Sequence, residues 1–361
     1  MKKVKVLHVL GGFNFGGAET FIINLYRNID REKFQFDALI RDINNPQAIE
    51  FEALGGEVYK TAPFPKMFIR NWIETKKFFK HHAWQYDVIH IHANALVYVL
   101  PILWAKKYNC KKIILHSHNT QTKSNQIIHQ INKIWLKYVN VCLACGTEAG
   151  KWMFDERPFT VIHNGINLSK YQYNLQIAEQ KREEIGFLKD DFIIGHVGRF
   201  AKQKNHKFLI EIFEEILKEE KKAKLLLIGN GELKENIENL IKEKGIQKSV
   251  CILSNRKDVP KLLQAMDIFV FPSLYEGLSI ALIEAQATGL PCVISDTIDR
   301  KSAICENVEA VSLDDSITKW VSTIMRYRSQ KNIREKAIEI IKNEGYSIDS
   351  TVESLEKIYI E

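Results

Sequence analysis

The chain has 361 residues, which predicts two domains at roughly 150 residues per domain. Apolar residues make up 45% and charged residues 26%, a balance typical of a globular protein, and this excludes a disordered chain, a collagen-like repeat and a disulfide scaffold. Residues 1–170 hold 23 Lys and Arg against 13 Asp and Glu, whereas the remainder holds 28 against 31. A basic half joined to a mildly acidic half indicates two bodies with different partners. The basic half shows no finger, ribonucleoprotein or basic-zipper pattern, so we do not expect nucleic acid as a partner.

The sequence carries no signal for membrane insertion, secretion or disulfides. Its longest apolar run, residues 95–105, contains Pro101 and is too short to cross a bilayer. Charged Lys5 interrupts the apolar N-terminal stretch, which is unlike a signal peptide, so we expect a cytoplasmic protein. The one close cysteine pair, Cys142 and Cys145, lacks the second pair of a zinc site, which favours buried free thiols.

Short β-branched segments alternate with longer amphipathic segments along the whole chain. Strands are expected in a first series at 4–10, 34–40, 88–92, 112–116, 141–144 and 160–162. Strands are expected in a second series at 192–197, 224–228, 250–253, 267–271 and 291–294. Helices lie between them, for example at 18–29 and 125–138. This alternation predicts an α/β protein with two Rossmann-like domains, each a parallel sheet covered by helices on both faces.

The first strand runs into a glycine-rich turn that ends in Gly16-Gly17-Ala18-Glu19. Glycines let backbone amides approach a ligand, and the helix that follows offers its positive end to an anion. The spacing is not the G-x-G-x-x-G of dinucleotide enzymes, which argues against a nicotinamide cofactor. A glycine-rich turn without a ligand is the alternative.

Two strands of the first half end in paired histidines, His90 with His92 and His116 with His118. Residues two apart share a face of a strand, so four imidazoles would cluster if these strands are neighbours. A metal site is one interpretation, but no carboxylate stands beside either pair in the sequence, and hydrogen-bonding core histidines are the simpler one. We expect no metal. His118 is the histidine best placed to face a cleft.

In the second half, cations and acids follow two strand ends. Arg199 and Lys204 flank the turn after the strand at 192–197, where two cations suit a diphosphate; solvated surface charges are the alternative. After the strand at 267–271, Glu276 precedes a helix start, where unpaired amides bind anions. Glu284 lies eight residues later in an apolar helix and needs a polar partner there, a ribose diol or a structural salt bridge.

Together these motifs resemble the retaining nucleotide-sugar glycosyltransferases of the GT-B fold, family 4, and in particular the capsule and exopolysaccharide enzymes of bacteria. The resemblance covers the chain from the first strand to about residue 300. It is carried in register by four motifs: Gly16-Gly17-Ala18-Glu19, His116-Ser117-His118-Asn119, Gly198-Arg199…Lys204-Asn205, and the E-x7-E of Glu276 and Glu284. Asn167 is a departure, because the family commonly has aspartate there.

The resemblance implies two Rossmann-like domains whose parallel sheets face each other across a cleft. Residues 1–168 would form the acceptor side, with the C-terminal helix at about 346–361 packing back on it, and residues 169–345 would bind the nucleotide sugar. It also implies a role for each site residue. Arg199 and Lys204 would hold the diphosphate, His118 the transferred sugar and Glu284 the ribose. The donor's phosphate, sugar and base would meet the remaining residues: Gly16, Gly17, Glu276, Gly277, Leu278, Ser279, Asn255 and Arg256.

The function expected from this resemblance is transfer of a hexose, with retention, from a UDP-sugar to a growing glycan linked to a polyprenyl diphosphate. The alternatives are a UDP-sugar epimerase of the same fold and an inactive nucleotide-sugar-binding subunit. The sequence contains no D-x-D triplet, the usual carboxylate pair for a divalent ion, so we expect no metal and no other cofactor.

One segment of the basic half, residues 66–83, has apolar residues at helical spacing among seven Lys, Arg and His. Such a helix can lie on the anionic inner face of a membrane with its aromatic side inward. An ordinary helix whose apolar stripe covers the sheet would satisfy the same pattern. The apolar residues are Phe68, Ile69, Trp72, Ile73 and Phe79.

Overall fold

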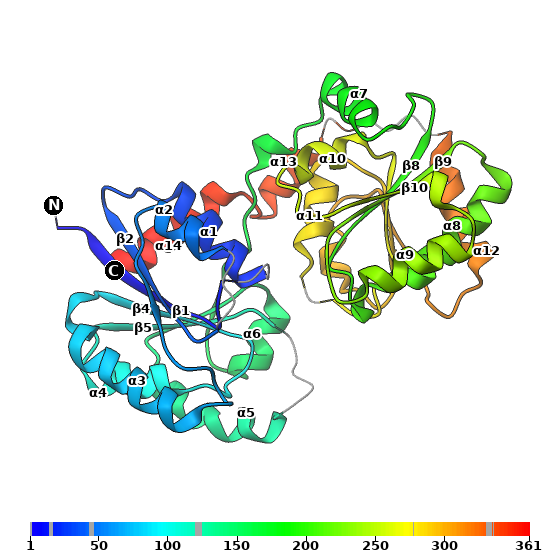
Figure 1. The fold of residues 1–361 in the computed structure, drawn as a ribbon. Helices are drawn as coiled ribbons and strands as arrows, with labels where there is room; N and C mark the ends of the chain where they lie inside the picture. The colour runs from blue at the N-terminus through cyan, green and yellow to red at the C-terminus, as the bar shows by residue number, and fades with distance from the viewer. Residues whose placement is uncertain are drawn as a thin grey trace. The chain divides into compact units, whose positions relative to one another are not determined.

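The computed structural model describes residues 2–13, 17–42, 47–119, 125–276, 278–329, 334 and 336–361 (Figure 1). Contacts divide the chain into two compact units. The first unit comprises residues 1–166 and 345–361, and the second comprises residues 167–344. The division falls within two residues of the boundaries expected at 168 and 345. The C-terminal segment therefore belongs to the first unit.

The first unit contains a seven-stranded sheet whose pairs are all parallel. The strand order is β3-β2-β1-β4-β5-β6-β7, so the order reverses direction between β1 and β4. Ligands of open parallel sheets collect at such a switch point, beyond the carboxyl ends of the strands. The strands are β1 (Val4–Val9), β2 (Phe34–Ile40), β3 (Val58–Lys60), β4 (Val88–Ala93), β5 (Lys112–Ser117), β6 (Val141–Ala144) and β7 (Thr160–Val161).

Helices cover both faces of this sheet (Figure 1). One face packs against α1 (Gly17–Asn28), α2 (Ala48–Ala53) and α14 (Ile348–Ile360). The other packs against α3 (Phe68–His82), α4 (Leu100–Lys107) and α6 (Thr147–Phe154). The C-terminal helix α14 is held here because Leu355 and Tyr359 are buried in the same core as α1.

The second unit contains a six-stranded parallel sheet in the order β10-β9-β8-β11-β12-β13, with its switch point between β8 and β11. Two parallel α/β sheets confirm the expected fold class. The strands are β8 (Phe192–Val197), β9 (Ala223–Ile228), β10 (Val250–Leu253), β11 (Ile268–Phe271), β12 (Cys292–Ser295) and β13 (Val308–Val311).

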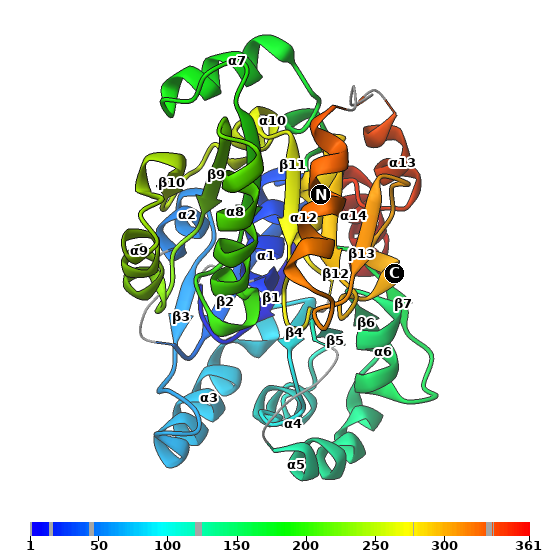
Figure 2. The ribbon, with the colours of Figure 1, turned by 90° about the vertical axis from the view of Figure 1, so that its right-hand side faces the viewer.

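The helices of the second unit also lie on both faces of its sheet. Figure 2 shows α8 (His206–Glu219) and α12 (Ile317–Met325) in front of the strands, and with α9 (Lys234–Glu243) they bury one face. In Figure 1 the other face carries α10 (Val259–Ala265), α11 (Ile280–Ala287) and α13 (Ala337–Asn343). Helix α7 (Leu175–Glu184) packs against α10.

The structure differs from the sequence-based elements at the edges of the sheets. The short strands β3 and β13 were not predicted, because three or four residues with mixed polarity carry too little of a strand pattern. The expected helix at 125–138 is instead a short helix, α5 (Gln126–Asn132), followed by the 3₁₀ segment η2 (Lys133–Tyr138).

Two further expectations can be compared with the described residues. Cys142 and Cys145 are buried free thiols, as predicted. Among the helices described, none combines the length and the apolar character that crossing a membrane requires.

Candidate functional site

A buried ion pair lies at the switch point of the second unit. Lys204 ends the 3₁₀ segment η4 (Lys202–Lys204) after β8, and its Nζ lies 2.8 Å from Oε1 of Glu276, in the loop after β11. Their side chains are only 15% and 7% exposed. The Lys204 ammonium also lies 4.4 Å from the centre of the Phe271 ring. An ammonium has three donors, so Lys204 can bind an anion while it keeps Glu276.

Backbone contacts fix the position of this pair. The amide of Leu274 donates to the carbonyl oxygen of Gln203 at 2.8 Å, and the Gln203 side-chain amide donates to the carbonyl oxygen of Tyr275 at 2.9 Å. These bonds join the loop that carries Lys204 to the loop that carries Glu276. The cation is therefore preorganised, which is what stabilisation of a leaving group requires.

Arg199 differs from Lys204 in both exposure and partner. Its side chain is 73% exposed and pairs with Glu232 at 3.1 Å. A Cβ atom on Gly229, which has φ +156°, would lie 1.9 Å from the carbonyl oxygen of Gly198, so only glycine allows this approach between the loops after β8 and β9. Exposed ion pairs contribute little stability, so the Arg199 guanidinium can leave Glu232 for a stronger anion.

The helix after β11 starts shortly after Glu276, where the sequence predicted a helix start. Helix α11 begins at Ile280, and the amides of Leu282 and Ile283 donate to the carbonyl oxygen of Ser279. The amides before these have no acceptor within the helix, which favours an anion at this end. Leu278 and Ser279 are the described residues at this position.

Glu284 has a partner that the sequence did not reveal. The hydroxyl group of Tyr171 donates a hydrogen bond to Oε1 of Glu284. Burial raises the pKa of Glu284 to about 7, and the tyrosine bond opposes this rise. Burial and the neighbouring carboxylate also raise the pKa of Tyr171. The polar partner is thus a hydroxyl group rather than a salt bridge, and a hydroxyl-binding carboxylate suits a diol.

Arg256 takes part in an ion network with α7 and the start of α10. Its Nε and Nη2 atoms each lie 2.7 Å from a carboxylate oxygen of Asp258, and Nη2 is also 2.7 Å from Glu184. Lys181 binds Asp258 at 2.7 Å. Asn255 is exposed and adopts a left-handed conformation, with φ 55°. The expected place of these two residues beside a base stays a prediction.

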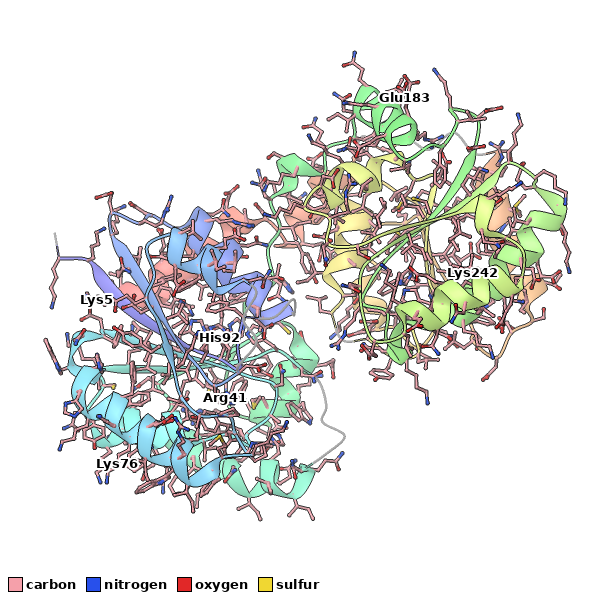
Figure 3. The ribbon with its side chains drawn as sticks, viewed as in Figure 1. Lys5, Arg41, Lys76, His92, Glu183 and Lys242 are labelled. Carbon is pink, nitrogen blue, oxygen red and sulfur yellow. The ribbon has the colours of Figure 1, made fainter. Side chains whose placement is uncertain are left out.

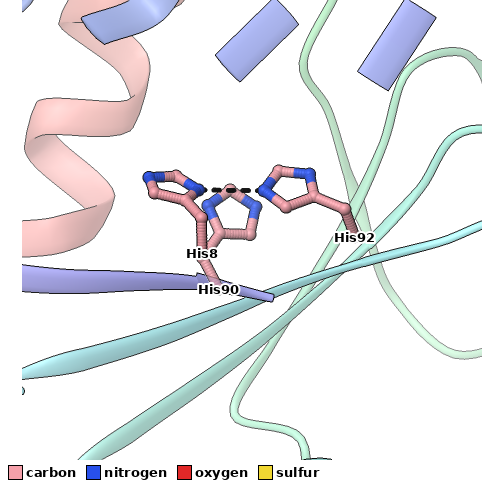
Figure 4. A group of neighbouring side chains, drawn as sticks. All are labelled: His8, His90 and His92. Atoms are coloured by element: carbon pink, nitrogen blue, oxygen red, sulfur yellow. Dashed lines mark hydrogen bonds between the residues drawn. The ribbon is translucent and has the colours of Figure 1, made fainter. Parts of the chain in front are cut away.

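In the first unit, five histidines gather at the carboxyl ends of β1, β4 and β5. His92 lies 2.9 Å from His118 on one side, Nδ1 to Nε2, and 2.9 Å from His8 on the other, Nε2 to Nδ1. Figure 4 shows the rings of His8 and His92 joined by this bond, with His90 beside them. His90 forms a second chain, with its Nδ1 2.7 Å from the hydroxyl oxygen of Tyr359 and its Nε2 3.3 Å from Nδ1 of His116.

Burial keeps these imidazoles neutral. It lowers the pKa of His8 and of His118 to about 3, and it lowers the pKa of His90, His92 and His116 well below the usual value. Two triads, His8-His90-His92 and His92-His116-His118, have ligand atoms within 4.8 Å of one another, as a metal site would need. Each imidazole has at least one hydrogen-bond partner in the cluster, but Nε2 of His8 and of His116 have none among the described residues. Among the described residues, the buried His118 Nδ1 has no hydrogen-bond partner.

Two charged groups, Glu19 and Arg41, lie near the glycine-rich turn of the first unit. Gly17 is the first residue of α1, and Glu19 lies in its first turn with a pKa raised by burial. Arg41 follows β2, with Nη1 3.3 Å from the carbonyl oxygen of Leu10 and its guanidinium 4.4 Å from the centre of the Tyr98 ring (Figure 3). Burial lowers the pKa of Arg41. Its place directly after a strand end was the signal that could have identified it.

Comparisons with known proteins identify the family. Residues 15–170 match the family model described as Glycosyltransferase Family 4, and residues 177–344 match the one described as Glycosyl transferases group 1. Over 375 residues the chain is 32% identical to the glycosyltransferase-class protein EpsF of Bacillus subtilis (strain 168), covering 98% of this chain and 96% of EpsF. The chain belongs to glycosyltransferase family 4.

Two further relatives and one solved structure are also similar to this glycosyltransferase. CapH of Staphylococcus aureus, a capsular polysaccharide biosynthesis glycosyltransferase, is 26% identical over 379 residues and 99% of both chains. An Escherichia coli UDP-Gal:alpha-D-GlcNAc-diphosphoundecaprenol alpha-1,3-galactosyltransferase is 25% identical, covering 77% of this chain and 76% of that enzyme. Among solved structures, HepE of Anabaena superposes with a TM-score of 0.80 at 17% identity, covering 98% of this chain and 99% of HepE, which shows the shared GT-B fold.

In this glycosyltransferase the structure brings some of the expected site residues together and leaves others apart. Lys204 and Glu276 are in contact, and Leu278, Ser279 and Glu284 belong to the start or body of the helix after them. His118 lies in the histidine cluster of the other unit. Sequence reasoning missed His8, Arg41 and Tyr171. Gly16 and Gly277, which were also expected in the site, lie outside the described residues.

Proposed function

We propose that this glycosyltransferase transfers a hexose from a UDP-sugar to a growing, polyprenyl-diphosphate-linked glycan, with retention at the anomeric carbon. The observation that carries the proposal is the buried Lys204–Glu276 pair beside the start of α11 and beside strand β11. A fixed cation next to open helix amides is suited to a nucleotide diphosphate. Solved structures with this fold include HepE in complex with UDP and glucose, which supports uridine as the nucleoside of the donor.

Each group at the second unit's switch point has a role in this proposal. Lys204 and the α11 amides bind the diphosphate, and Arg199 joins them by leaving Glu232. Glu284 and Tyr171 accept the ribose hydroxyls, while Glu276 faces the sugar. The proposal gives His118 a hydroxyl group of the transferred hexose, because its Nδ1 is buried without a partner among the described residues and its imidazole is neutral.

The reaction needs no nucleophile from the protein. The bond between the anomeric carbon and the β-phosphate oxygen breaks, and its electron pair goes to that oxygen. The acceptor hydroxyl forms the new bond on the same face of the sugar, and its proton passes to the leaving phosphate. Lys204 and Arg199 stabilise the growing negative charge, which assigns them to the transition state rather than to binding alone.

The acceptor is inferred from two relatives. The E. coli enzyme is named for a diphosphoundecaprenol acceptor, and so is a Campylobacter jejuni N-acetylgalactosaminyltransferase that is 27% identical over half of each chain. CapH is named for capsular polysaccharide biosynthesis. We therefore propose a role in capsule or exopolysaccharide synthesis, at the inner face of the membrane where such an acceptor would meet a cytoplasmic donor.

Ligand-induced stabilisation can test the donor, because a ligand that binds the folded state raises its melting temperature by mass action. UDP-, GDP-, ADP- and dTDP-sugars should be compared, and only UDP-sugars are expected to give a clear shift. The stabilising donor is then incubated with a polyprenyl-diphosphate-linked saccharide, and NMR of the product reads the anomeric configuration.

Three outcomes would contradict the proposal. A product with inverted configuration would exclude retention. An epimerised sugar formed from the donor alone would favour a UDP-sugar epimerase. Tight donor binding with no product from any acceptor would favour an inactive nucleotide-sugar-binding subunit.

A further inference from the structure

Helix α3 exposes its apolar side rather than burying it. Phe68, Ile69 and Ile73 are 52%, 73% and 52% exposed, and Trp72 is 37% exposed. Of the apolar residues noted in the sequence pattern of this segment, only Phe79 is in the core. The alternative interpretation, in which the stripe covers the sheet, is therefore wrong for four of its five residues.

Polar residues hold α3 in this orientation. Its inward side carries Asn71 and Thr75 as well as two phenylalanines. The Asn71 side-chain amide donates to the carbonyl oxygen of Ala62 at 2.6 Å, and the Thr75 hydroxyl lies 3.1 Å from the hydroxyl of Tyr98. Turning the helix to bury its apolar stripe would break these buried hydrogen bonds, which is costly.

A second apolar strip lies on α5 and η2. This segment is held by His129, which accepts a hydrogen bond from the amide of Leu96 at 3.0 Å and stacks on Trp152 with ring centres 4.2 Å apart. Its isoleucines face solvent. They are 75%, 44%, 66% and 59% exposed, in the order Ile127, Ile128, Ile131 and Ile134.

The two strips belong to one edge of the first unit. Helix α4 contacts both α3 and η2, and Trp72 packs edge-on against Trp104 of α4, with ring centres 5.4 Å apart. In both ribbon views α3, α4 and α5 lie along the same lower edge of this unit (Figures 1 and 2). We call the exposed residues of α3, α4, α5 and η2 the basic apolar surface.

The charge of this surface is strongly one-sided. The four segments contain eight Lys and Arg residues and one acid, Glu74, which pairs with Arg70 at 2.7 Å. Lys133 pairs with Asp155. Lys76, labelled in Figure 3, extends over the Trp72 ring at 5.1 Å. Exposed isoleucine and tryptophan among unopposed cations are the composition that anionic lipid attracts.

We propose that the basic apolar surface docks on an anionic lipid bilayer, with the α3 and α5 apolar side chains entering the headgroup layer. A second copy of this chain fits the surface poorly, because it would set one cationic face against another. The inference deepens the proposed function by naming the surface that meets the membrane. It does not depend on which nucleotide the donor carries.

Vesicle flotation tests this docking with the full chain. Vesicles of phosphatidylcholine alone are compared with vesicles that also contain phosphatidylglycerol, at low and at raised salt. The protein is expected to float with anionic vesicles at low salt and to lose most of that binding at raised salt. Failure to float with anionic vesicles at low salt, or concentration-dependent self-association without any flotation, would overturn the proposal.

Two pairs of variants show whether this surface is responsible. Ile69→Gln with Ile131→Gln, and Lys77→Glu with Lys80→Glu, should each lower the bound fraction at least tenfold. Matched controls are Ile49→Gln, an isoleucine of α2 that is 76% exposed, and Lys242→Glu with Lys248→Glu in the second unit; both should float like the unmodified protein.

Hydrolysis of the UDP-sugar in the absence of lipid should be the same in all of these proteins. This readout separates the two proposals, because loss of vesicle binding with intact hydrolysis concerns docking alone. Equal flotation of the surface variants and their controls would contradict the assignment of this surface.

Discussion

The two units share one architecture but place opposite chemistry at its switch point. Between β1 and β4, the first unit gathers five imidazoles that burial keeps uncharged. Between β8 and β11, the second unit buries a salt bridge, Lys204 with Glu276, and follows it with the acid Glu284. The same fold position thus provides neutral hydrogen-bonding groups in one unit and fixed charges in the other.

This difference indicates which part of a sugar donor each unit is suited to bind. The proposed nucleotide diphosphate would develop charge as it leaves, and the preorganised cation of the second unit suits that charge. Neutral imidazoles can donate to or accept from a sugar hydroxyl without adding charge. The bonds in the His118–His92–His8 chain couple the three tautomers, because each neutral ring has one donor and one acceptor. Whether His118 Nδ1 donates or accepts therefore depends on the tautomer of His8, which lies two hydrogen bonds along this chain.

The largest effect is expected for Lys204→Ala. Removal of a preorganised group that stabilises leaving-group charge typically lowers kcat about 10² to 10³-fold. The substitution also leaves Glu276 buried without its cation, which destabilises the fold. Turnover at saturating donor and the melting temperature are the measurements. Lys207→Ala, at a lysine of α8 whose side chain is 75% exposed, is the control and should stay near normal.

A double variant tests whether the lost stability comes from the unpaired acid. Lys204→Ala with Glu276→Gln should regain the melting temperature, because no unpaired charge stays buried, while turnover remains low. Normal turnover in a folded Lys204→Ala protein would show that this cation serves structure alone and would break the contrast between the two units.

A smaller effect distinguishes the two acids of the second unit. Glu284→Ala should weaken UDP and UDP-sugar alike by about 10 to 100-fold, the range for a hydrogen bond to a charged group, because both ligands carry the ribose. Glu276→Ala should lower transfer while it changes the affinity for free UDP less. Calorimetric titration with UDP measures the affinity, and initial rates measure transfer. Equal weakening of UDP binding by both variants would contradict the division of roles.

Much of this arrangement could be predicted from the sequence, because it depends on strand ends. Strong β-branched runs fixed the central strands, and parallel pairing of β4 with β5 brought the two histidine pairs together, as expected. The proximity of Lys204 and Glu276 follows from the pairing of β8 with β11, since both residues come shortly after those strands.

The rest depends on contacts that local patterns do not encode. Tyr171 meets Glu284 across 113 positions of the chain, and His8 joins the cluster only because β1 pairs with β4. The sequence suggested that Arg256 binds a ligand, but in the structure it pairs with Glu184 of α7. Helix α3 was ambiguous because its inward side is partly polar, so its hydrophobic pattern could not decide which side faces the sheet.

The pH dependence of stability should have opposite signs for the buried histidines of both units, which include His196 and His206 of the second unit, and for Glu284. A buried histidine whose pKa falls to about 3 stays neutral in the folded state while the unfolded state gains a proton below about 6.5. Stability is therefore lost as the pH falls, by about 2 kcal/mol for each such histidine between pH 7 and 5. Glu284 has a raised pKa of about 7, so the folded state holds its proton longer, and stability is lost as the pH rises from 5 to 7, by about 2 kcal/mol.

Calorimetry between pH 5 and 7 measures both trends. The transition of the first unit should move to lower temperature as the pH falls, and Glu284→Gln should make the second unit lose stability more steeply on acidification, because the opposing contribution of Glu284 is gone while those of His196 and His206 remain. Glu243→Gln, at an exposed acid of α9, is the control and should leave both trends unchanged. An unchanged pH dependence in Glu284→Gln would contradict the raised pKa of Glu284.

The smallest effect is expected from removal of metal ions. At the proposed phosphate position the second unit has its own cation, Lys204, and the first amides of α11, and the sequence holds no D-x-D triplet for a divalent ion. We therefore expect turnover to be unchanged after EDTA treatment and after addition of manganese. The EDTA measurement also tests for a metal in the first unit, because its histidine triads have ligand atoms within 4.8 Å of one another. Activity lost in EDTA and restored by manganese would show that a metal, and not Lys204, neutralises the diphosphate. If His92→Asn abolished that restoration, the metal would belong to the histidine cluster, and the two switch points would share one catalytic task.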